Sequence, residues 1–575
     1  MVENPHTHSH ENPFISEITR RLREHAGLEE GAVKSLITIP PRPEMGDYAL
    51  PCFTFKDKLQ KAPALIAKEL AGSPLAGGEI IRVEAHGPYL NFFVERNRLA
   101  QWVLEEVFAE KNSYGQPGIG HGKTVVIDFS SPNIAKHLGV HHLRSAVIGN
   151  ALYKLHKALG YRVIGINHLG DWGTQFGQLI TAFRHWGSEE ALQDNPIGAL
   201  NGLYVKFHEE ARENPSLEEE ARAAFKDLEG GNPDTRKLWE HFREMSLKEF
   251  NKVYDALGIK FDHYTGESFY NEMLDDTVER LKSAGLTTIS DEALIVDLDE
   301  YDMPPCLLKK RDEASLYATR DICAAEYRHK EYGFSKMLYV VGSEQKLHFR
   351  QVFKVLELLG DDWVKDCAHV DFGLIKFKHG RMSTRKGEII LLEEVLNEAV
   401  TRASEIIDEK NPGLENKERI ARQVGIGAVV FTDLSTRRAK DVVFDWDVVL
   451  NFDGETGPYV QYTHARLCSV IRKYGKPVGT DVDYGLLKEE DEYLLVRKLE
   501  QFTQATEGAV RSCEPMIVCN YLLELCGTFN RYYNHHRILG PDETLTKARI
   551  LLSDSVRQAI RNGLTLLGLQ TPEEM

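Results

Sequence analysis

The sequence predicts an α/β protein that is built around a parallel sheet. A strand at 124–129, an amphipathic helix at about 142–159 and a second strand at 162–167 follow one another, which is the pattern of a right-handed βαβ unit. A strand-like run returns at 338–341, after an acidic and helix-rich stretch from about 185 to 300. These observations predict one parallel sheet with a helical insertion between its halves.

The central helix has clear local signals. Leu143, Val147, Ala151 and Leu155 recur at i, i+4 spacing and share one face, as in a helix that packs on a sheet. Gly160 suits the left-handed residue that ends such a helix. Because the strands on both sides run parallel, we expect the ligand site at their carboxyl ends.

The two ends of the chain follow other patterns. Residues 13 to about 94 combine a helix that starts at Pro13 with a strand at 87–94, which predicts an α+β module, and a Gly/Pro-rich linker follows at 114–122. A strand, a basic loop and a second strand are expected at 372–390, and the chain beyond about 395 is almost wholly helical. We therefore predict three domains, at 1–115, at 116–400 with the insertion at about 185–300, and at 401–575.

The composition, 42% hydrophobic and 27% charged, is that of a globular protein. No apolar run reaches about 18 residues, and the opening residues lack the segments of a secretory signal, so we expect a cytoplasmic protein with no membrane span. None of the eight cysteines forms Cys-x-x-Cys, which predicts reduced thiols and no protein-only metal site. The net charge of −17 argues against binding nucleic acid through a globally basic surface, but leaves a specific RNA partner open.

A polar loop connects the first strand to the central helix. It carries Asn133, Lys136 and His137, and His141 and His142 stand where the helix begins. Backbone N–H groups and the positive helix end would hold a phosphate there while it is attacked. Adjacent histidines on a helix point apart, which argues against a metal site. The alternative is a loop whose histidines only cap and solvate; the crowding of such groups favours an anion site.

Two further segments have side chains suited to a charged ligand. On a helix, Tyr317 and Asp321 share a face, and a carboxylate with a phenol suits a planar guanidinium, although ordinary surface pairing is the commoner outcome of that spacing alone. The stretch 380–387 places three cations and two hydroxyls between glycines, which favours a clamp for a polyphosphate over a solvated turn.

Two strings suggest other contacts. Residues 167–177, directly after the second strand, mix Gly, Trp and polar residues, as in the wall of a ligand site. Residues 529–540 mix aromatic and basic side chains, which suits stacking on unpaired RNA bases and equally suits a packed helix with a polar edge.

Together these strings resemble the arginyl-tRNA synthetases, class I enzymes that attach arginine to tRNA. The matching motifs, in the family's order, are Ser-Ser-Pro-Asn-Ile-Ala-Lys, His-Leu-Arg-Ser, Asn-His-Leu-Gly-Asp-Trp-Gly-Thr-Gln-Phe-Gly, Leu-Tyr-Ala-Thr-Arg-Asp, Gly-Pro-Tyr-Val-Gln-Tyr-Thr-His-Ala-Arg and, near the end, Arg-Asn-Gly-Leu-Thr-Leu-Leu-Gly-Leu-Gln. The ordered set extends over most of the chain and is highly specific.

The resemblance implies a Rossmann-like catalytic domain with a helical insertion, an N-terminal α+β domain that contacts tRNA and a C-terminal all-α anticodon-binding domain. It implies that the arginine carboxylate attacks the α-phosphate of ATP, with Mg²⁺ accompanying the nucleotide. The arginyl group then passes to the terminal adenosine of tRNA(Arg). In this family activation generally needs the bound tRNA, and we expect a monomer.

The resemblance also assigns residues by position. It implies that arginine is bound by Asp128, Ser130, Asn133, Tyr317, Asp321 and Gln345, and ATP by Gly139, His141, His142 and Met382. Catalysis is assigned to Lys136, His141, His142, Arg381, Ser383, Arg385 and Lys386, and tRNA binding to Tyr459, Arg466 and Arg531.

Three departures from the family pattern stand out. Asp128 replaces a common Glu, and Arg381 and Arg385 replace the lysines of the K-M-S-K-S loop, for which Lys386 or Lys136 would compensate. In the H-V-G-H motif His142 matches the last His, whereas Gly139 stands at the first His and His141 at the Gly. A non-catalytic RNA-binding relative and a different nucleotidyl-transferring enzyme on the same fold are the alternatives.

Overall fold

The computed structural model describes residues 12–40, 42–309, 317–378 and 390–575. Its core is a four-stranded sheet with the order β10-β9-β4-β5. The strands are β4 (Thr124–Asp128), β5 (Arg162–Ile166), β9 (Lys336–Tyr339) and β10 (Cys367–His369), and every neighbouring pair is parallel. The predicted parallel sheet is therefore confirmed, with the returning strand two residues earlier than expected.

Helix α6 (His142–Ala158) makes the crossover between β4 and β5. All four residues of its predicted apolar face, Leu143, Val147, Ala151 and Leu155, are buried. Gly160 follows the helix with a φ of +84°, a conformation that glycine adopts without strain. The local signals therefore predicted this unit correctly.

The N-terminal module is α+β, as predicted. Its antiparallel sheet has the order β1-β3-β2. The elements are α1 (Pro13–Ala26), α2 (Glu30–Leu36), β1 (Tyr48–Pro51), α3 (Lys56–Leu59), α4 (Pro63–Ala71), β2 (Ile80–His86) and β3 (Tyr89–Val94). Helix α5 (Arg96–Glu110) then leads into the rest of the chain.

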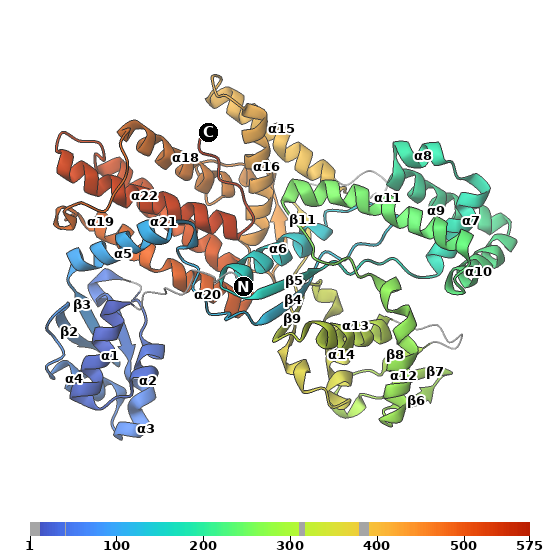
Figure 1. Ribbon diagram of the computed structural model, residues 1–575, viewed down its shortest axis with the longest axis horizontal. Coiled ribbons are helices and arrows are strands. Elements are labelled where there is room, and N and C mark those ends of the chain that lie inside the picture. The colour runs from blue at the N-terminus through green and yellow to red at the C-terminus, as the bar shows by residue number, and fades with distance from the viewer. Residues whose placement is uncertain (1–11, 41, 310–316, 379–389) are drawn as a thin grey trace, which may run out of the picture.

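The insertion begins as a helical lobe that stands beside the sheet (Figure 1). Its helices are α7 (Thr174–Trp186), α8 (Glu189–Asp194), α9 (Pro196–Glu213), α10 (Ser216–Glu229) and α11 (Pro233–Leu257). A second part contains α12 (Leu274–Ser283) and an unpredicted antiparallel sheet of β6 (Thr287–Ser290), β7 (Ala293–Val296) and β8 (Cys306–Lys309). Helices α13 (Tyr317–Tyr332) and α14 (Lys346–Leu358) flank β9 in the chain.

The stretch at 372–390 has a partner that the sequence did not indicate. Strand β11 (Ile375–Phe377) pairs in parallel with β12 (Val442–Phe444), about 67 residues further along. Strand β12 lies within the helical region and is three residues long, so its apolar run was too short to be predicted as a strand. Residues 379–389, which include the basic loop, lie outside the described residues.

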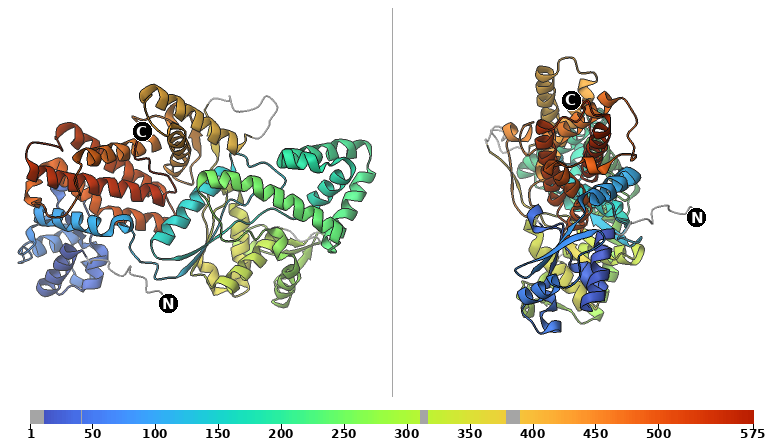
Figure 2. Two further views of the ribbon diagram at one scale, coloured as in Figure 1. Left: turned by 45° about the horizontal axis from the view of Figure 1, so that its top comes forward. Right: turned by 90° about the vertical axis from the view of Figure 1, so that its left-hand side faces the viewer.

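The remaining C-terminal elements are helices, as expected. They are α15 (Leu392–Lys410), α16 (Lys417–Leu434), α17 (Trp446–Val449), α18 (Gly457–Tyr474), α19 (Glu490–Glu500), α20 (Phe502–Ser512), α21 (Met516–His535) and α22 (Glu543–Leu566). Helices α19 and α22 pack on α5, which follows the N-terminal module, although hundreds of residues separate them in the chain, and Figure 2 shows this part of the molecule from two sides. Across the described residues, no helix has the length and apolar character needed to cross a membrane.

Candidate active site

The loop after β4 has an unusual backbone. Ser130, Ser131 and Ala135 have φ values of +75°, +50° and +60°, which L-residues rarely adopt. Such conformations cost about 1–3 kcal/mol each and persist only where the surroundings fix them. The loop is therefore held in shape by its neighbours, and the predicted ligand Asn133 lies exposed within it.

The predicted wall at 167–177 is one of these neighbours. The Ser131 N–H donates to Asn167 Oδ1 (3.2 Å), and Asn133 forms a parallel bridge with Gly170. A Cβ on Gly170 would lie 1.8 Å from Asn133 Oδ1, so only glycine allows this approach. The structure thus brings two of the predicted segments together.

The histidines at the start of α6 are held as neutral rings. Burial lowers the pKa of His142 to about 4, with the neighbouring His141 adding to the effect. His142 Nδ1 lies 3.1 Å from Gly139 N and 3.2 Å from Gly139 O. Because that carbonyl already accepts from the His142 N–H (3.0 Å), we assign Nδ1 as the acceptor from the Gly139 N–H, which leaves Nε2 to carry the hydrogen. His142 is therefore suited to donate a hydrogen bond at neutral pH, without a charge of its own.

His141 does not point away from His142, as the sequence had suggested. The two ring centroids lie 4.0 Å apart with the planes tilted by 41°. His141 precedes α6 with a φ of −64° and a ψ of −21°, so a helical backbone alone does not keep two adjacent rings apart. Burial also lowers the pKa values of His141 and His137.

The same loop contacts the segment that follows the basic loop. Val140 N donates to Ile390 O (2.9 Å), Leu392 N donates to Leu138 O (2.8 Å), and Gly139 forms an antiparallel bridge with Leu391. The predicted residues Arg381, Met382, Ser383, Arg385 and Lys386 lie outside the described residues. Lys136 is exposed and its Nζ lies 5.9 Å from the Tyr204 ring centroid on α9, so it faces the insertion.

Asp128 has partners within the chain. Its Oδ2 pairs with an Arg328 guanidinium nitrogen at 2.8 Å, and its Oδ1 accepts from Ser131 Oγ at 3.0 Å. Arg328 is buried, and the sequence reasoning missed it, although it follows Asp321 by two turns on the same face of α13. Asp128 and Arg328 thus tie α13 to the loop after β4.

Asp321 is also paired, but at the surface of the site. His348 Nε2 lies 2.5 Å from its Oδ2, and about a quarter of each side chain is exposed. Burial raises the pKa of Asp321, but the His348 hydrogen bond and charge outweigh it and hold the pKa below its usual value. The carboxylate is therefore ionised and able to accept a cation.

Tyr317 and Gln345 lie at the starts of α13 and α14, the helices that carry Asp321 and His348. Tyr317 starts α13, one turn before Asp321 as predicted, and is 71% exposed. Gln345 is exposed at the start of α14. Strands β4 and β9 are adjacent and Asp128 is in register with Tyr339, so the loops that follow them leave the same edge of the sheet.

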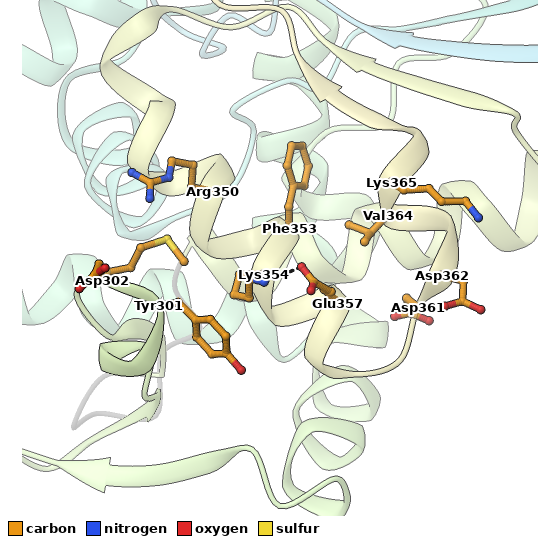
Figure 3. Close-up of a pocket in the computed structure, with 11 residues that line it drawn as sticks. Tyr301, Asp302, Arg350, Phe353, Lys354, Glu357, Asp361, Asp362, Val364 and Lys365 are labelled. Carbon is orange, nitrogen blue, oxygen red and sulfur yellow. Dashed lines mark hydrogen bonds and ion pairs between the residues drawn. The ribbon is translucent and has the colours of Figure 1, made fainter. Parts of the chain in front are cut away.

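A separate cavity of about 710 Å³ lies on another face of α14 (Figure 3). Tyr301, Arg350, Phe353 and Glu357 are among its lining residues. Among the described residues, none of those predicted for the site line this cavity. Its lining carries both basic and acidic side chains, which do not suit a ligand of a single charge sign. The strand ends therefore remain the candidate active site.

Comparison with known proteins matches three families along the chain. Residues 14–94 match the arginyl tRNA synthetase N terminal domain, residues 103–446 the class I (R) tRNA synthetase catalytic domain, and residues 460–575 the DALR anticodon binding domain. The arginine–tRNA ligase of Clostridium perfringens is 50% identical over 97% of this chain and 99% of its own length. The chain belongs to the arginyl-tRNA synthetases.

Solved structures of arginyl-tRNA synthetases have the same fold. The enzyme from Thermus thermophilus superposes with a TM-score of 0.81 at 24% identity, covering 98% of this chain and 99% of its own. The enzyme from Plasmodium falciparum gives 0.81 at 22% identity, covering 98% of both chains. The predicted family and fold class are therefore confirmed.

The residues predicted to contact tRNA lie on the C-terminal helices of this arginyl-tRNA synthetase chain. Arg466 on α18 has its guanidinium carbon 4.8 Å from the Tyr462 ring centroid and 5.2 Å from that of Tyr533 on α21, and both rings are 38% exposed. Asn530 joins the two helices, accepting from Arg466 (2.8 Å) and donating to the Tyr459 hydroxyl (3.0 Å).

Arg531 has a different environment. Its Nε donates to Asp491 Oδ1 on α19 at 2.9 Å, so its charge is already paired. Tyr462 and Tyr533 were missed as individual residues, although the strings that contain them had been singled out. The signal that identifies them is the arginine between two aromatic rings, which only the packing of α18 against α21 reveals.

Proposed function

We propose that the chain attaches L-arginine to tRNA(Arg) in two steps. ATP and arginine first give arginyl-adenylate and pyrophosphate, and the arginyl group then passes to the 3′-terminal adenosine with release of AMP. The observation that carries the proposal is the full-length similarity to arginine–tRNA ligases, at 50% identity over 97% of the chain. The ionised Asp321 beside the strand ends supports arginine as the amino acid.

In this proposal Asp321 opposes the substrate guanidinium and Tyr317 shares its face. A charge-assisted bidentate pair is the geometry that a guanidinium and a carboxylate favour. Asn133, Ser130 and Gln345 bind the rest of the arginine molecule. Asp128 acts mainly by holding Ser131 and Arg328, because both of its oxygens have partners.

ATP lies over the start of α6 near Gly139 and His141, where the neutral His142 donates to the α-phosphate as charge develops. The nucleophile that attacks the α-phosphate is the carboxylate of arginine itself. The protein therefore contributes orientation and electrostatic stabilisation. Mg²⁺ arrives with ATP, since this ion is held largely by phosphates and water. Lys136, Arg381, Ser383, Arg385 and Lys386 complete the phosphate contacts, and Met382 contacts ATP.

The C-terminal helices recognise unpaired bases of tRNA(Arg). The exposed rings of Tyr462 and Tyr533, with Arg466 between them, offer flat faces on which bases stack. Tyr459 and Arg531 lie beside this platform. We assign tRNA contact also to residues 1–115, the catalytic reaction to 116–400 and anticodon binding to 401–575. One chain carries all of these sites, which supports a monomer, and we propose that it acts in the cytoplasm.

Pyrophosphate exchange tests the proposal directly. We expect exchange between ATP and labelled pyrophosphate that depends on arginine, among the twenty amino acids, and appears only when tRNA(Arg) is present. Exchange with another amino acid would contradict the substrate. Binding of tRNA without any exchange would instead indicate a non-catalytic relative, consistent with the departure at Gly139 and His141.

A further inference from the structure

We infer that α11 of the insertion holds the arginine-binding loop in its active shape, with Tyr254 as a positioning residue for arginine binding. This inference rests on the proposed site. The helix runs from the insertion lobe back to the sheet (Figure 1), and its last two turns carry Tyr254. The insertion therefore has a role in the reaction that its position beside the sheet alone does not indicate.

The Tyr254 hydroxyl joins the two segments that build the site. It lies 2.8 Å from Ser130 Oγ, in the loop after β4, and 3.1 Å from Asn167 Nδ2, after β5. All three side chains are buried, so water cannot easily replace these contacts. One phenol from the insertion thus fixes the spacing of both strand-end segments.

The direction of the hydrogen bond between Asn167 and Tyr254 can be worked out. The Ser131 N–H must donate to Asn167 Oδ1, so the Asn167 amide nitrogen faces Tyr254 and donates to it. Burial raises the pKa of Tyr254 to about 12, so its hydroxyl keeps its single hydrogen at neutral pH. Either hydroxyl can be the donor in the contact between Tyr254 and Ser130; where Tyr254 donates, the Ser130 hydroxyl hydrogen is free to donate to the substrate.

The need for such a support follows from the backbone of the loop. Ser130 has a φ of +75°, and its N–H donates to Ser145 Oγ at 2.8 Å. The Tyr254 contact holds the side chain of the same residue, so both ends of Ser130 are fixed. Without it, the loop can relax toward more common conformations and move Asn133.

A second residue of α11 supports the other strained position. Ser246 Oγ accepts from the Ala135 N–H at 2.9 Å, where Ala135 has a φ of +60°. Ser246 in turn donates to Phe242 O within the helix at 2.7 Å. Helix α11 therefore contacts the loop on both sides of Asn133.

Tyr254→Phe tests the inference, because it removes only the hydroxyl. We expect the arginine KM in tRNA-dependent exchange to rise about tenfold or more, as for small misplacements of a bound substrate. The ATP KM should stay within about twofold of the wild-type value. In the double variant with Ser130→Ala, we expect the two effects on kcat/KM to be clearly non-additive, since each removes the same hydrogen bond.

Tyr264→Phe is the matched control. The Tyr264 hydroxyl also donates to α11, to Asn251 Oδ1 at 2.9 Å, without contacting the loop. We expect this variant to keep wild-type kinetics. A Tyr254→Phe enzyme that loses thermal stability but keeps its arginine KM overturns the inference, as does a KM equal to that of the control.

The variant Asn133→Ala distinguishes a failure of this inference from a failure of the proposed site. If Asn133→Ala and Tyr254→Phe both leave the arginine KM unchanged, the site itself is misplaced. If only Asn133→Ala raises it, the site stands and the role of Tyr254 is wrong.

Discussion

At the residue scale, the charges of this site are paired before any ligand arrives. Asp128 is neutralised by the buried Arg328, whereas Asp321 pairs with His348 at a position where about a quarter of each side chain is exposed. A buried pair that loses one partner is strongly destabilised, but a partly exposed one can exchange partners. The difference in exposure therefore supports our proposal that Asp128 acts mainly by holding the structure and that Asp321 contacts the substrate.

We predict that Asp321→Asn raises the arginine KM with little change in the ATP KM. The loss of a charge-assisted contact costs about 1.5–3 kcal/mol, which is roughly a 10- to 150-fold increase. Steady-state exchange kinetics at varied arginine concentration measure it. Asp361→Asn, which removes a carboxylate paired with Arg280 at 2.9 Å, is the control and should bind arginine normally. An unchanged KM in Asp321→Asn would place the pocket elsewhere.

For His142 we predict a loss of kcat in the His142→Ala variant of about 10²–10³, the range for removing one donor to a developing charge. His142→Gln, which keeps an N–H donor, should recover part of it. Because the pKa of His142 is about 4, its ring is neutral above that pH and contributes no inflection to kcat between pH 6 and 8. Single-turnover rates across this range check both points, and a fully active His142→Ala enzyme refutes the role.

At the element scale, local sequence signals predicted helices and strands correctly where several signals agreed. The βαβ unit was predicted because apolar periodicity and Gly160 point to the same boundaries. The partner of β11 and the sheet of β6, β7 and β8 were not, because non-local pairing leaves little trace in short strands. For the same reason the sequence indicated Asp128 and Asp321 but neither Arg328 nor His348, which reach them only through packing.

The pair of helices α18 and α21 leads to a third prediction. Arg466→Lys keeps the charge but removes the planar group between Tyr462 and Tyr533, so we expect the tRNA KM to rise about tenfold, within the ~1–3 kcal/mol that base stacking contributes. Aminoacylation at varied tRNA concentration measures this effect. Arg472→Lys on the same helix, where Arg472 pairs with Glu574 at 3.3 Å, should leave it unchanged. Equal effects from both variants would indicate a general charge contribution instead.

At the scale of the whole molecule, the N-terminal module is joined to the C-terminal helices by buried polar contacts. Tyr48 contacts Glu500, and Asp47 contacts Tyr493 and Arg497. Helix α5 lies against α19 and α22 at the same place. Because these groups are buried, their partners must remain in place for the fold to be stable.

This interface should make stability depend on pH. Burial, with Glu110 and Glu500 nearby, raises the pKa of Glu106 on α5 to about 8. The fold thus favours the protonated carboxyl, so its contribution is fully present below its ordinary pKa of 4.5 and is lost as pH rises through about 8. We expect the Tm of Glu106→Gln to fall less than that of the wild type between pH 6 and 9.

Glu30→Gln serves as the control for this experiment. Glu30 forms an exposed pair with Arg23 at 2.9 Å, so its variant should follow the wild-type Tm at each pH. Parallel curves for Glu106→Gln and the wild type would show that Glu106 is already ionised in the folded protein.

The contact between Asp47 and Tyr493 also has a consequence for synthesis, because the two residues are 446 positions apart. At about 5–20 residues per second, the ribosome needs roughly 20–90 seconds to make the chain between them. During that time Asp47 and Tyr48 lack their C-terminal partners Tyr493, Arg497 and Glu500. The N-terminal module therefore completes these polar contacts only after α19 has been synthesised.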